Sequence, residues 1–368
     1  MTQLTPTQQQ ILAEIEAAKQ NVNTDGYKMS IGEIINLCRD GEMKLDPAFQ
    51  RLFRWEDEQK TKLIESILIG IPVPEIFVAQ KGDNRWHVVD GVQRLSTLLQ
   101  FAGALEGYEK LVLKTCKYIP SIEGCTWDTL PDDITRGLKR AKLNISIIHT
   151  GGTDEAQYEL FQRLNTGGTV LSEQEKRNCL ILMINPSFFE KIEELKNYPN
   201  FRECLTLSED DYKQELHMEL ILRMFIGYHD NVVYSEHGPI HKIVLDSFID
   251  KETIRLIKEA NLAQFEVDFK KTFDKLKNTL EKESFKKYDT EAHRFKGGFN
   301  VSAFEMLTIG ISKNINTVEQ LGNSELKDKI INLYLEEKIK ASLGRGVRAI
   351  QRFKDTSEFV KEYFSDTK

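Results

Sequence analysis

Five consecutive residues, Asp90, Gly91, Val92, Gln93 and Arg94, include the side chains that suit binding of a phosphate group. The first backbone N–H groups of a helix lack intrahelical partners and carry partial positive charge, so an anion binds well there. Gly91 allows a tight turn and close approach of the backbone, and Arg94 offers two parallel donors to phosphate oxygens. Asp90 is suited to hold Mg²⁺ directly or through water, and Gln93 is suited to position a water. Taken alone, these residues also fit an ordinary Asp-Gly turn followed by a surface arginine.

A second polar group lies earlier in the chain, where Gln50, Arg51, Arg54 and Trp55 follow Pro47. Proline disfavours helical backbone in the residue before it, so we expect an exposed and irregular segment here. Arginines beside an aromatic ring suit a base or a phosphate, by stacking and by charge. The alternative interpretation is a solvated basic edge with Trp55 packed into the core.

Two later stretches carry weaker patterns. The first, residues 161–168, contains an Asn-Thr-Gly-Gly run that is typical of a helix C-cap. The second contains Arg345, Arg348 and Arg352, whose three- and four-residue spacing would place them on one face of a helix. Such a face suits contact with nucleic-acid phosphates, and it equally suits an ordinary solvated helix.

Local patterns place the turn at 90–94 between a strand and a helix. Residues 86–90 predict a strand, and leucines at helical spacing predict a helix over 94–102. Capping-box patterns at Ser30 and Ser172 predict the starts of two helices. The other expected elements are helices at 6–20, 30–39, 56–69 and 154–164, strands at 75–80 and 143–149, and a nearly all-helical pattern after 186.

The bulk composition describes a protein of 368 residues with 40% hydrophobic residues, enough for two domains with a sizeable core. We predict a helical arm at 1–29, a first domain at 30–185 and a helical domain at 186–368. The net charge of -7 disfavours a general nucleic-acid binder but allows a local basic surface. Five scattered cysteines without a Cys-x-x-Cys pair, no membrane-length apolar run and no signal-peptide pattern lead us to expect a cytoplasmic protein without a membrane partner.

Three ordered blocks resemble the DGQQR-motif family, which forms the N-terminal part of GmrSD-type restriction enzymes within the ParB/sulfiredoxin-like superfamily. The blocks read LDPAFQRLFRWEDEQKTKLIESILIGIPVPEIFV, WHVVDGVQRLSTLLQF and FQRLNTGGTVLSEQEKRN, and they cover about residues 30–180. Weaker similarity continues in RMFIGY, FKGGFNVSAFEML and RGVRAIQRF. The resemblance implies an α+β fold, with a ParB/sulfiredoxin-like nucleotide domain followed by a mostly α-helical domain.

The resemblance also implies binding and hydrolysis of a nucleoside triphosphate (NTP). It carries nucleotide-binding roles over to Asp90, Gly91, Gln93 and Arg94. The family's earlier Gln-Arg block maps to Gln50 and Arg51, which we also assign to nucleotide binding, although in the family this region lies near the nucleotide or contacts DNA. We expect catalytic roles for Asp90, Gln93 and Arg94, with Asp90 suited by its carboxylate to hold Mg²⁺ directly or through water. One position departs from the family, because its first motif glutamine is Val92 here. A valine side chain cannot hydrogen-bond to a phosphate or a water, so turnover depends on whether only the backbone N–H of this position takes part.

Fused members of the family carry a second nuclease domain of the His-Asn-His type. The clustered pair His237 and His241 lacks a following Asn/His framework at metal-site spacing. We therefore expect a stand-alone form that lacks this domain and acts with a separate nuclease effector.

We hypothesise an NTP-binding and NTP-hydrolysing sensor or regulatory subunit of a bacterial DNA-restriction, anti-phage defence system. Mg²⁺ with ATP, GTP or CTP is the expected cofactor, and DNA, the effector and a second copy of the chain are the expected partners. One alternative is a non-enzymatic DNA-binding module that uses the same turn for a DNA phosphate. Its nucleic-acid contacts would include Arg54, Arg345, Arg348 and Arg352. Another alternative is a ParB-like nuclease.

Overall fold

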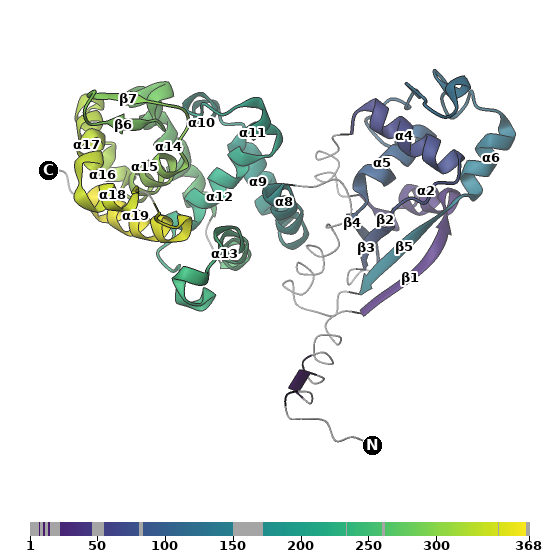
Figure 1. Cartoon of the computed structure of the whole chain (residues 1–368), viewed down its shortest axis with the longest axis horizontal. Helices are drawn as coiled ribbons and strands as arrows, with labels where there is room; N and C mark the ends of the chain where they lie inside the picture. Colours follow the sequence, from purple (N-terminus) through teal and green to yellow (C-terminus); the bar gives the residue numbers. More distant parts are fainter. Residues whose placement is uncertain are drawn as a thin grey trace. The chain divides into compact units, whose positions relative to one another are not determined.

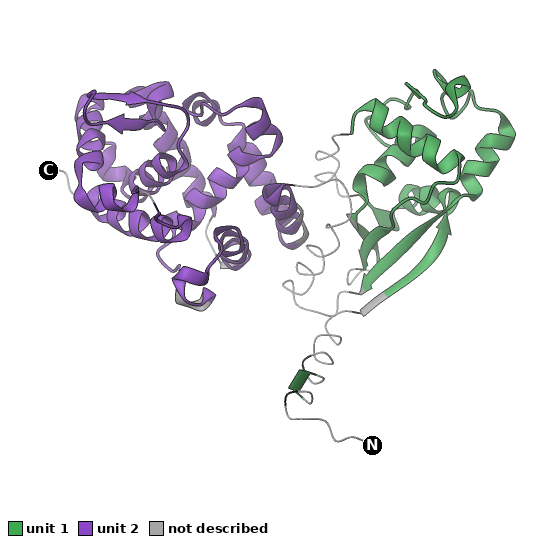
Figure 2. Ribbon diagram, viewed as in Figure 1, with its two compact units in different colours: residues 1–170 green, residues 171–368 purple. Residues whose placement is uncertain are grey.

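The chain forms two compact units, residues 1–170 and residues 171–368 (Figure 2). The computed structural model describes residues 7, 10, 11, 14, 23–45, 55–80, 84–149, 172–232, 234–259, 262–344 and 346–365. Unit 1 contains a mixed sheet with helices, and unit 2 is mostly helical. This arrangement confirms the predicted α+β class. Among the described helices, none combines the length and the apolar character that crossing a membrane requires.

Unit 1 is built on a five-stranded mixed sheet with the strand order β1-β5-β3-β4-β2. Its strands are β1 (Asn23–Ser30), β2 (Met43–Lys44), β3 (Ile76–Gln80), β4 (Trp86–Asp90) and β5 (Lys142–His149). β5 pairs antiparallel with β1 and parallel with β3. β4 pairs antiparallel with β3 and parallel with β2. The strand β3 therefore lies at the centre of the sheet, with hydrogen-bonded neighbours on both sides.

Helices cover one face of this sheet (Figure 1). They are α2 (Ile31–Arg39), α4 (Asp57–Leu68), α5 (Val92–Ala102) and α6 (Asp132–Arg140), and a short 3₁₀ turn, η1 (Pro120–Ile122), precedes α6. Successive strand residues point to opposite faces, so Ile145 and Ile147 of β5 lie on the same face as each other. Both join one buried core with Val78 of β3, Ile34 of α2 and Leu98 of α5. This core fixes α5 against the sheet along its length.

Unit 2 is a helical assembly around α15. Its elements are α8 (Glu173–Ile184), α9 (Pro186–Lys196), α10 (Pro199–Cys204), α11 (Glu209–Lys213), α12 (Leu216–Tyr228), η3 (Tyr234–His237), η4 (Ile240–Lys242), α13 (Leu245–Glu259), α14 (Leu262–Leu280), η5 (Glu281–Glu283), β6 (Lys287–Asp289), β7 (Arg294–Lys296), α15 (Val301–Lys313), α16 (Ile315–Val318), α17 (Asn323–Leu335), α18 (Glu337–Ser342) and α19 (Ala349–Tyr363). α15 is buried from Ser302 to Ser312 and packs against α12 and α19. A Cβ atom at Gly310 would lie 2.5 Å from the ring of Phe364, so this glycine lets the C-terminal segment approach closely.

The sequence-based domain ranges and the compact units divide the chain differently around α8. The predicted first domain extends to 185, whereas unit 2 begins at Leu171. α8 packs against α9, α12 and α13. Its Arg177 is fully buried, and Arg177 Nε donates to Asp250 Oδ1 at 2.6 Å. The predicted ranges stay a prediction.

Most elements with a strong local pattern are confirmed within the described residues. Ser30 Oγ accepts the Glu33 N–H at 3.2 Å and begins α2, and Ser172 forms a full capping box with Glu175 at the start of α8. The helix at 56–69 and the strands at 75–80, 86–90 and 143–149 are present as α4, β3, β4 and β5. The helix predicted over 94–102 begins two residues earlier, at Val92. The segments at 46–54, 150–171 and most of 1–22 lie outside the described residues.

Candidate functional site

The turn at 90–94 joins the end of β4 directly to the start of α5. Gly91 lies between them with φ 88° and ψ 14°, in the left-handed region that side chains of L-residues disfavour. A Cβ atom on Gly91 would lie 2.9 Å from Ile76 Cγ1 and 3.3 Å from Arg94 Nη2. Both the backbone conformation and the surrounding space therefore require glycine. Because α5 begins at Val92, Arg94 belongs to the first turn of the helix.

A β-bulge lies immediately before this turn. Phe77 of β3 pairs with Asp90, whereas the next residue, Val78, pairs with Val88. One additional residue of β4 therefore lies between the two pairs, and such an insertion bends a strand and redirects the side chains that follow. The bulge sets the position from which Asp90 leaves the sheet.

Asp90 and Arg94 pair with each other. Arg94 Nη2 donates to Asp90 Oδ2 at 2.7 Å. The Arg94 side chain is 11% exposed and the Asp90 side chain 25% exposed, so water screens this pair only weakly. The two charges predicted to serve a phosphate and a cation thus neutralise one another. A ligand that uses both residues must replace this ion pair.

Gln93 connects the turn to the residues just before α4. Its side-chain Oε1 accepts the backbone N–H of Trp55 at 3.3 Å, and its backbone carbonyl accepts Thr97 Oγ1 at 2.7 Å. Val92 is half-buried and packs against the core of unit 1. The position of Gln93 therefore depends on the chain at Trp55, and the side chain of Val92 serves packing.

Several predicted site residues lie outside the described part of the chain. These are Gln50, Arg51, Arg54 and Arg345, together with the 161–168 run. Their roles stay predictions. Among the predicted site residues that the structure describes, Asp90, Gly91, Gln93 and Arg94 come together at one turn.

The two described arginines of the predicted C-terminal basic face lie at the start of α19. Arg348 is the exposed N-cap residue, and its Nη1 donates to the backbone carbonyl of His241. Arg352 lies one turn into the helix, and its Nε is buried without a hydrogen-bond partner among the described residues. These surroundings differ from one continuous exposed face, although a nucleic-acid role for the two residues stays a prediction.

The two clustered histidines of unit 2 have different surroundings. His237 Nε2 lies 2.8 Å from Glu252 Oε1, whereas His241 is exposed. In the described ranges, no group of three or more His, Cys, Asp or Glu side chains is placed to hold a metal ion. Mg²⁺ commonly binds through one or two carboxylates plus the phosphates of a nucleotide. The single, partly exposed Asp90 carboxylate fits a Mg²⁺ ion that arrives with an NTP.

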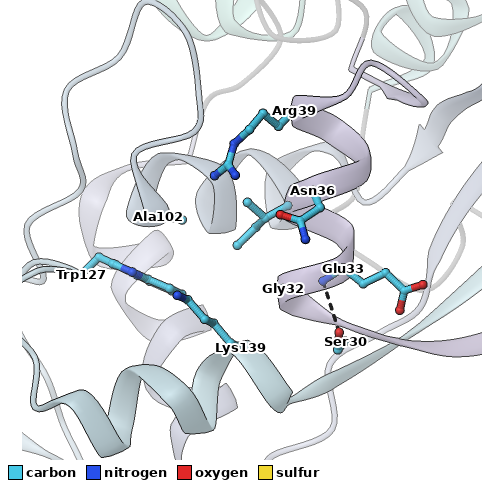
Figure 3. Close-up of a pocket in the computed structure, with 9 residues that line it drawn as sticks. Ser30, Gly32, Glu33, Asn36, Arg39, Ala102, Trp127 and Lys139 are labelled. Carbon is cyan, nitrogen blue, oxygen red and sulfur yellow. Dashed lines mark hydrogen bonds between the residues drawn. The ribbon is translucent and has the colours of Figure 1, made fainter.

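A pocket of about 470 Å³ lies at the other end of α5 (Figure 3). It is lined by Ser30, Gly32, Glu33, Ile35, Asn36, Arg39, Ala102, Trp127 and Lys139. Trp127 and Lys139 form one wall, with Lys139 Nζ 5.8 Å from the ring centroid, and Arg39 lies across the pocket from them. Arg39, Trp127 and Lys139 come from three separate segments of the chain. No local sequence pattern links them, which explains why the sequence did not identify the pocket.

Glu65 of α4 anchors the segment that leads to Trp127. Its carboxylate accepts the backbone N–H groups of Tyr118 at 2.6 Å, Ile119 at 2.8 Å and Lys117 at 3.3 Å. Burial alone would raise the pKa of Glu65, but the three donors outweigh it and hold that pKa below its ordinary value. The ionised form of Glu65 therefore stabilises this segment.

Comparison with known protein families found one match within the chain. Residues 31–182 match the family described as GmrSD restriction endonuclease, N-terminal domain. The matched range begins with α2, includes the turn at 90–94 and ends within α8. No curated protein and no solved structure matches the chain. The match supports a GmrSD-type N-terminal domain in this part of the chain.

Proposed function

We propose that the chain is an NTP-binding and NTP-hydrolysing sensor or regulatory subunit of a bacterial restriction-type defence system, acting with a separate effector nuclease. The match of residues 31–182 to the N-terminal domain of a restriction endonuclease supports the involvement in defence. One observation supports the nucleotide part of the proposal. A strand, a left-handed glycine and a helix bring Asp90 and Arg94 to the same end of α5.

The phosphates of the NTP would bind at the first turn of α5. The positive end of the helix dipole and the first backbone N–H groups favour an anion there. Gly91 permits the left-handed backbone that joins β4 directly to α5, and so places these N–H groups at the end of the strand. Arg94, in the first turn, would supply the bidentate partner that neutralises the phosphates.

Binding would exchange partners within the Asp90–Arg94 pair. Phosphate oxygens would take the place of Asp90 at the guanidinium group, and Asp90 would hold Mg²⁺ directly or through water. The bound ion supplies neutralising charge to the phosphates. If phosphate bound without Mg²⁺, the released Asp90 carboxylate would face another anion. We therefore expect NTP binding to require the cation.

Gln93 is the residue proposed to orient the attacking water. Its side chain already bonds to the backbone of Trp55, so the chain before α4 would help to hold it. The Val92 side chain packs against the core, which leaves only the backbone N–H of this position for a phosphate. Substituting Gln93 should therefore lower the rate of phosphate release more than it weakens NTP binding.

The direct test is calorimetric titration of ATP, GTP and CTP, each with and without Mg²⁺, with phosphate release measured in parallel. We expect Mg²⁺-dependent binding to the wild type, loss of this Mg²⁺-dependent binding in Arg94→Ala, and retained binding with slower release in Gln93→Ala. Arg140→Ala, which removes an exposed arginine of α6 that lines neither the turn nor the pocket, is the matched control and should bind NTP as the wild type does.

Three results would contradict the proposal. Absence of binding by a folded wild type would reject an NTP site. Binding that Arg39→Ala removes and Arg94→Ala retains would assign the nucleotide to the pocket at the other end of α5. DNA binding that depends strongly on salt and not at all on NTP would instead favour the DNA-binding module.

A further inference from the structure

The pocket at the C-terminal end of α5 presents polar groups that the described chain does not use. The side chains of Arg39 and Asn36 make no hydrogen bond or ion pair with any described residue. Among the described residues, the ammonium group of Lys139 interacts only with the ring of Trp127. This differs from neighbouring charges such as Arg136, which pairs with Asp133 at 2.6 Å. The pocket therefore contains hydrogen-bonding capacity that a ligand can take up without breaking an existing bond.

The wall residues combine an aromatic surface with positive charge. Trp127 is half-buried and held edge-to-face against Phe101, with ring centroids 5.6 Å apart. Arg39 and Lys139 add two positive charges, and Glu33 adds one negative charge, so the lining is net positive. A ring that stacks, cations that bind phosphate and an amide that both donates and accepts are the groups that proteins use to hold a nucleotide.

We propose that this pocket binds one nucleotide unit. The base would stack on Trp127, its edge would hydrogen-bond to Asn36, and its phosphate would be held by Arg39 and Lys139. The volume of about 470 Å³ falls within the ~300–1,000 Å³ of typical ligand pockets. The nucleotide comes either from free solution or from an unpaired position in a DNA strand, since both offer the same base and phosphate.

This site is separate from the turn at 90–94. Ala102, which lines the pocket, is the last residue of α5, whereas the turn at 90–94 includes the first residue, Val92. At 1.5 Å per residue, the 11 residues of α5 span roughly 16 Å. The proposal therefore holds whether or not NTP binds at Arg94.

The test measures binding of the four deoxynucleoside 5′-monophosphates by calorimetry and of a short fluorescein-labelled single-stranded DNA by anisotropy. Lys139→Ala and Trp127→Leu should each weaken binding by about tenfold or more, since stacking and phosphate contacts both contribute. Arg140→Ala is the matched control. It removes an equal charge from the adjacent residue of α6, which does not line the pocket, and should change the dissociation constant by less than about twofold.

Trp127→Phe is added because it keeps an aromatic ring against Phe101 while offering a smaller stacking surface, and it should weaken binding to an intermediate degree. Circular dichroism melting confirms that each variant is folded. Deoxyribose 5-phosphate, which lacks a base, should bind more weakly than any of the monophosphates.

Each outcome decides the proposal. Monophosphate binding with this variant pattern supports a free nucleotide as the source. DNA binding with the same pattern, without monophosphate binding, supports a nucleotide within a strand. Absence of both, equal loss in Lys139→Ala and Arg140→Ala, or loss only in Arg94→Ala would overturn it. Arg94→Ala alters only the turn at 90–94. Absence of nucleotide binding at the pocket can therefore be told apart from absence of NTP binding at the turn.

Discussion

The two ends of α5 place charged residues in opposite situations. At its start, Arg94 is buried and already bonded to Asp90, and Gly91 fits tightly against Ile76. At its end, Arg39 and Lys139 are exposed around an open pocket and bond to no described carboxylate. The same helix thus borders two different sites. The charged groups at its start pair with each other, whereas those at its end are exposed to solvent.

This difference separates the energetic roles of the two sites. Removing a paired and buried arginine leaves its partner's charge without a donor and destabilises the fold, and a ligand must compete with that partner. An exposed and unpaired arginine adds little to stability, so its groups are available to a ligand at small energetic cost. Substitutions at the start of α5 should therefore lower the free energy of unfolding, whereas substitutions at its end should leave it nearly unchanged.

The largest expected effect is at the two left-handed glycines that flank α5. Gly91→Ala should lower the free energy of unfolding by about 3 kcal/mol, because it adds backbone strain to a close contact with buried Ile76. Gly103→Ala should cost about 1 kcal/mol, since its φ is 70° but the contacted atoms belong to the flexible side chain of Lys110. Urea denaturation followed by circular dichroism measures both. An equal loss of unfolding free energy in the two variants would show that the contact with Ile76 adds no cost at Gly91.

The second effect compares the two arginines. Arg94→Ala should destabilise the protein by about 2 kcal/mol, because it leaves the partly buried Asp90 carboxylate without its charged donor. Arg39→Ala should change stability by less than about 0.5 kcal/mol. Combining Arg94→Ala with Asp90→Asn in a double-mutant cycle isolates the interaction. A coupling energy near zero would show that Asp90 and Arg94 do not stabilise each other.

The loss of stability expected at Glu65, which anchors the 117–119 segment on the way to Trp127, is smaller than those at Gly91 and Arg94, and it depends on pH. Glu65→Gln should cost about 1.5 kcal/mol at pH 7, because a neutral amide accepts the three backbone N–H groups less well. The pKa of Glu65 is lowered in the folded protein, so its stabilisation is present above the unfolded pKa of about 4.3 and is lost as pH falls through the folded pKa.

The stability difference between wild type and Glu65→Gln should accordingly shrink between pH 7 and pH 3. Denaturation curves at both values measure it. A difference that stays constant over this range would show that the charge of Glu65 does not stabilise the 117–119 segment.

The sequence alone determined the features that depend on neighbouring residues. The N-caps at Ser30 and Ser172 and the amphipathic helices were predictable, because their hydrogen bonds and apolar spacing lie within a few residues of each other. The glycine turn at 91 was predictable for the same reason. The NTP site at this turn, and the part that Gln50 and Arg51 would play in it, stay predictions.

Tertiary structure decided what depends on distant segments. The strand β1 contains Asp25-Gly26 and has little strand pattern, yet it is extended because β5 offers it a full backbone edge. The pairing of Asp90 with Arg94 depends on the bulge in β4 and on the space beside Ile76. The pocket joins Arg39, Trp127 and Lys139 from three segments. Packing against the sheet brings these groups together, and no local spacing encodes that contact.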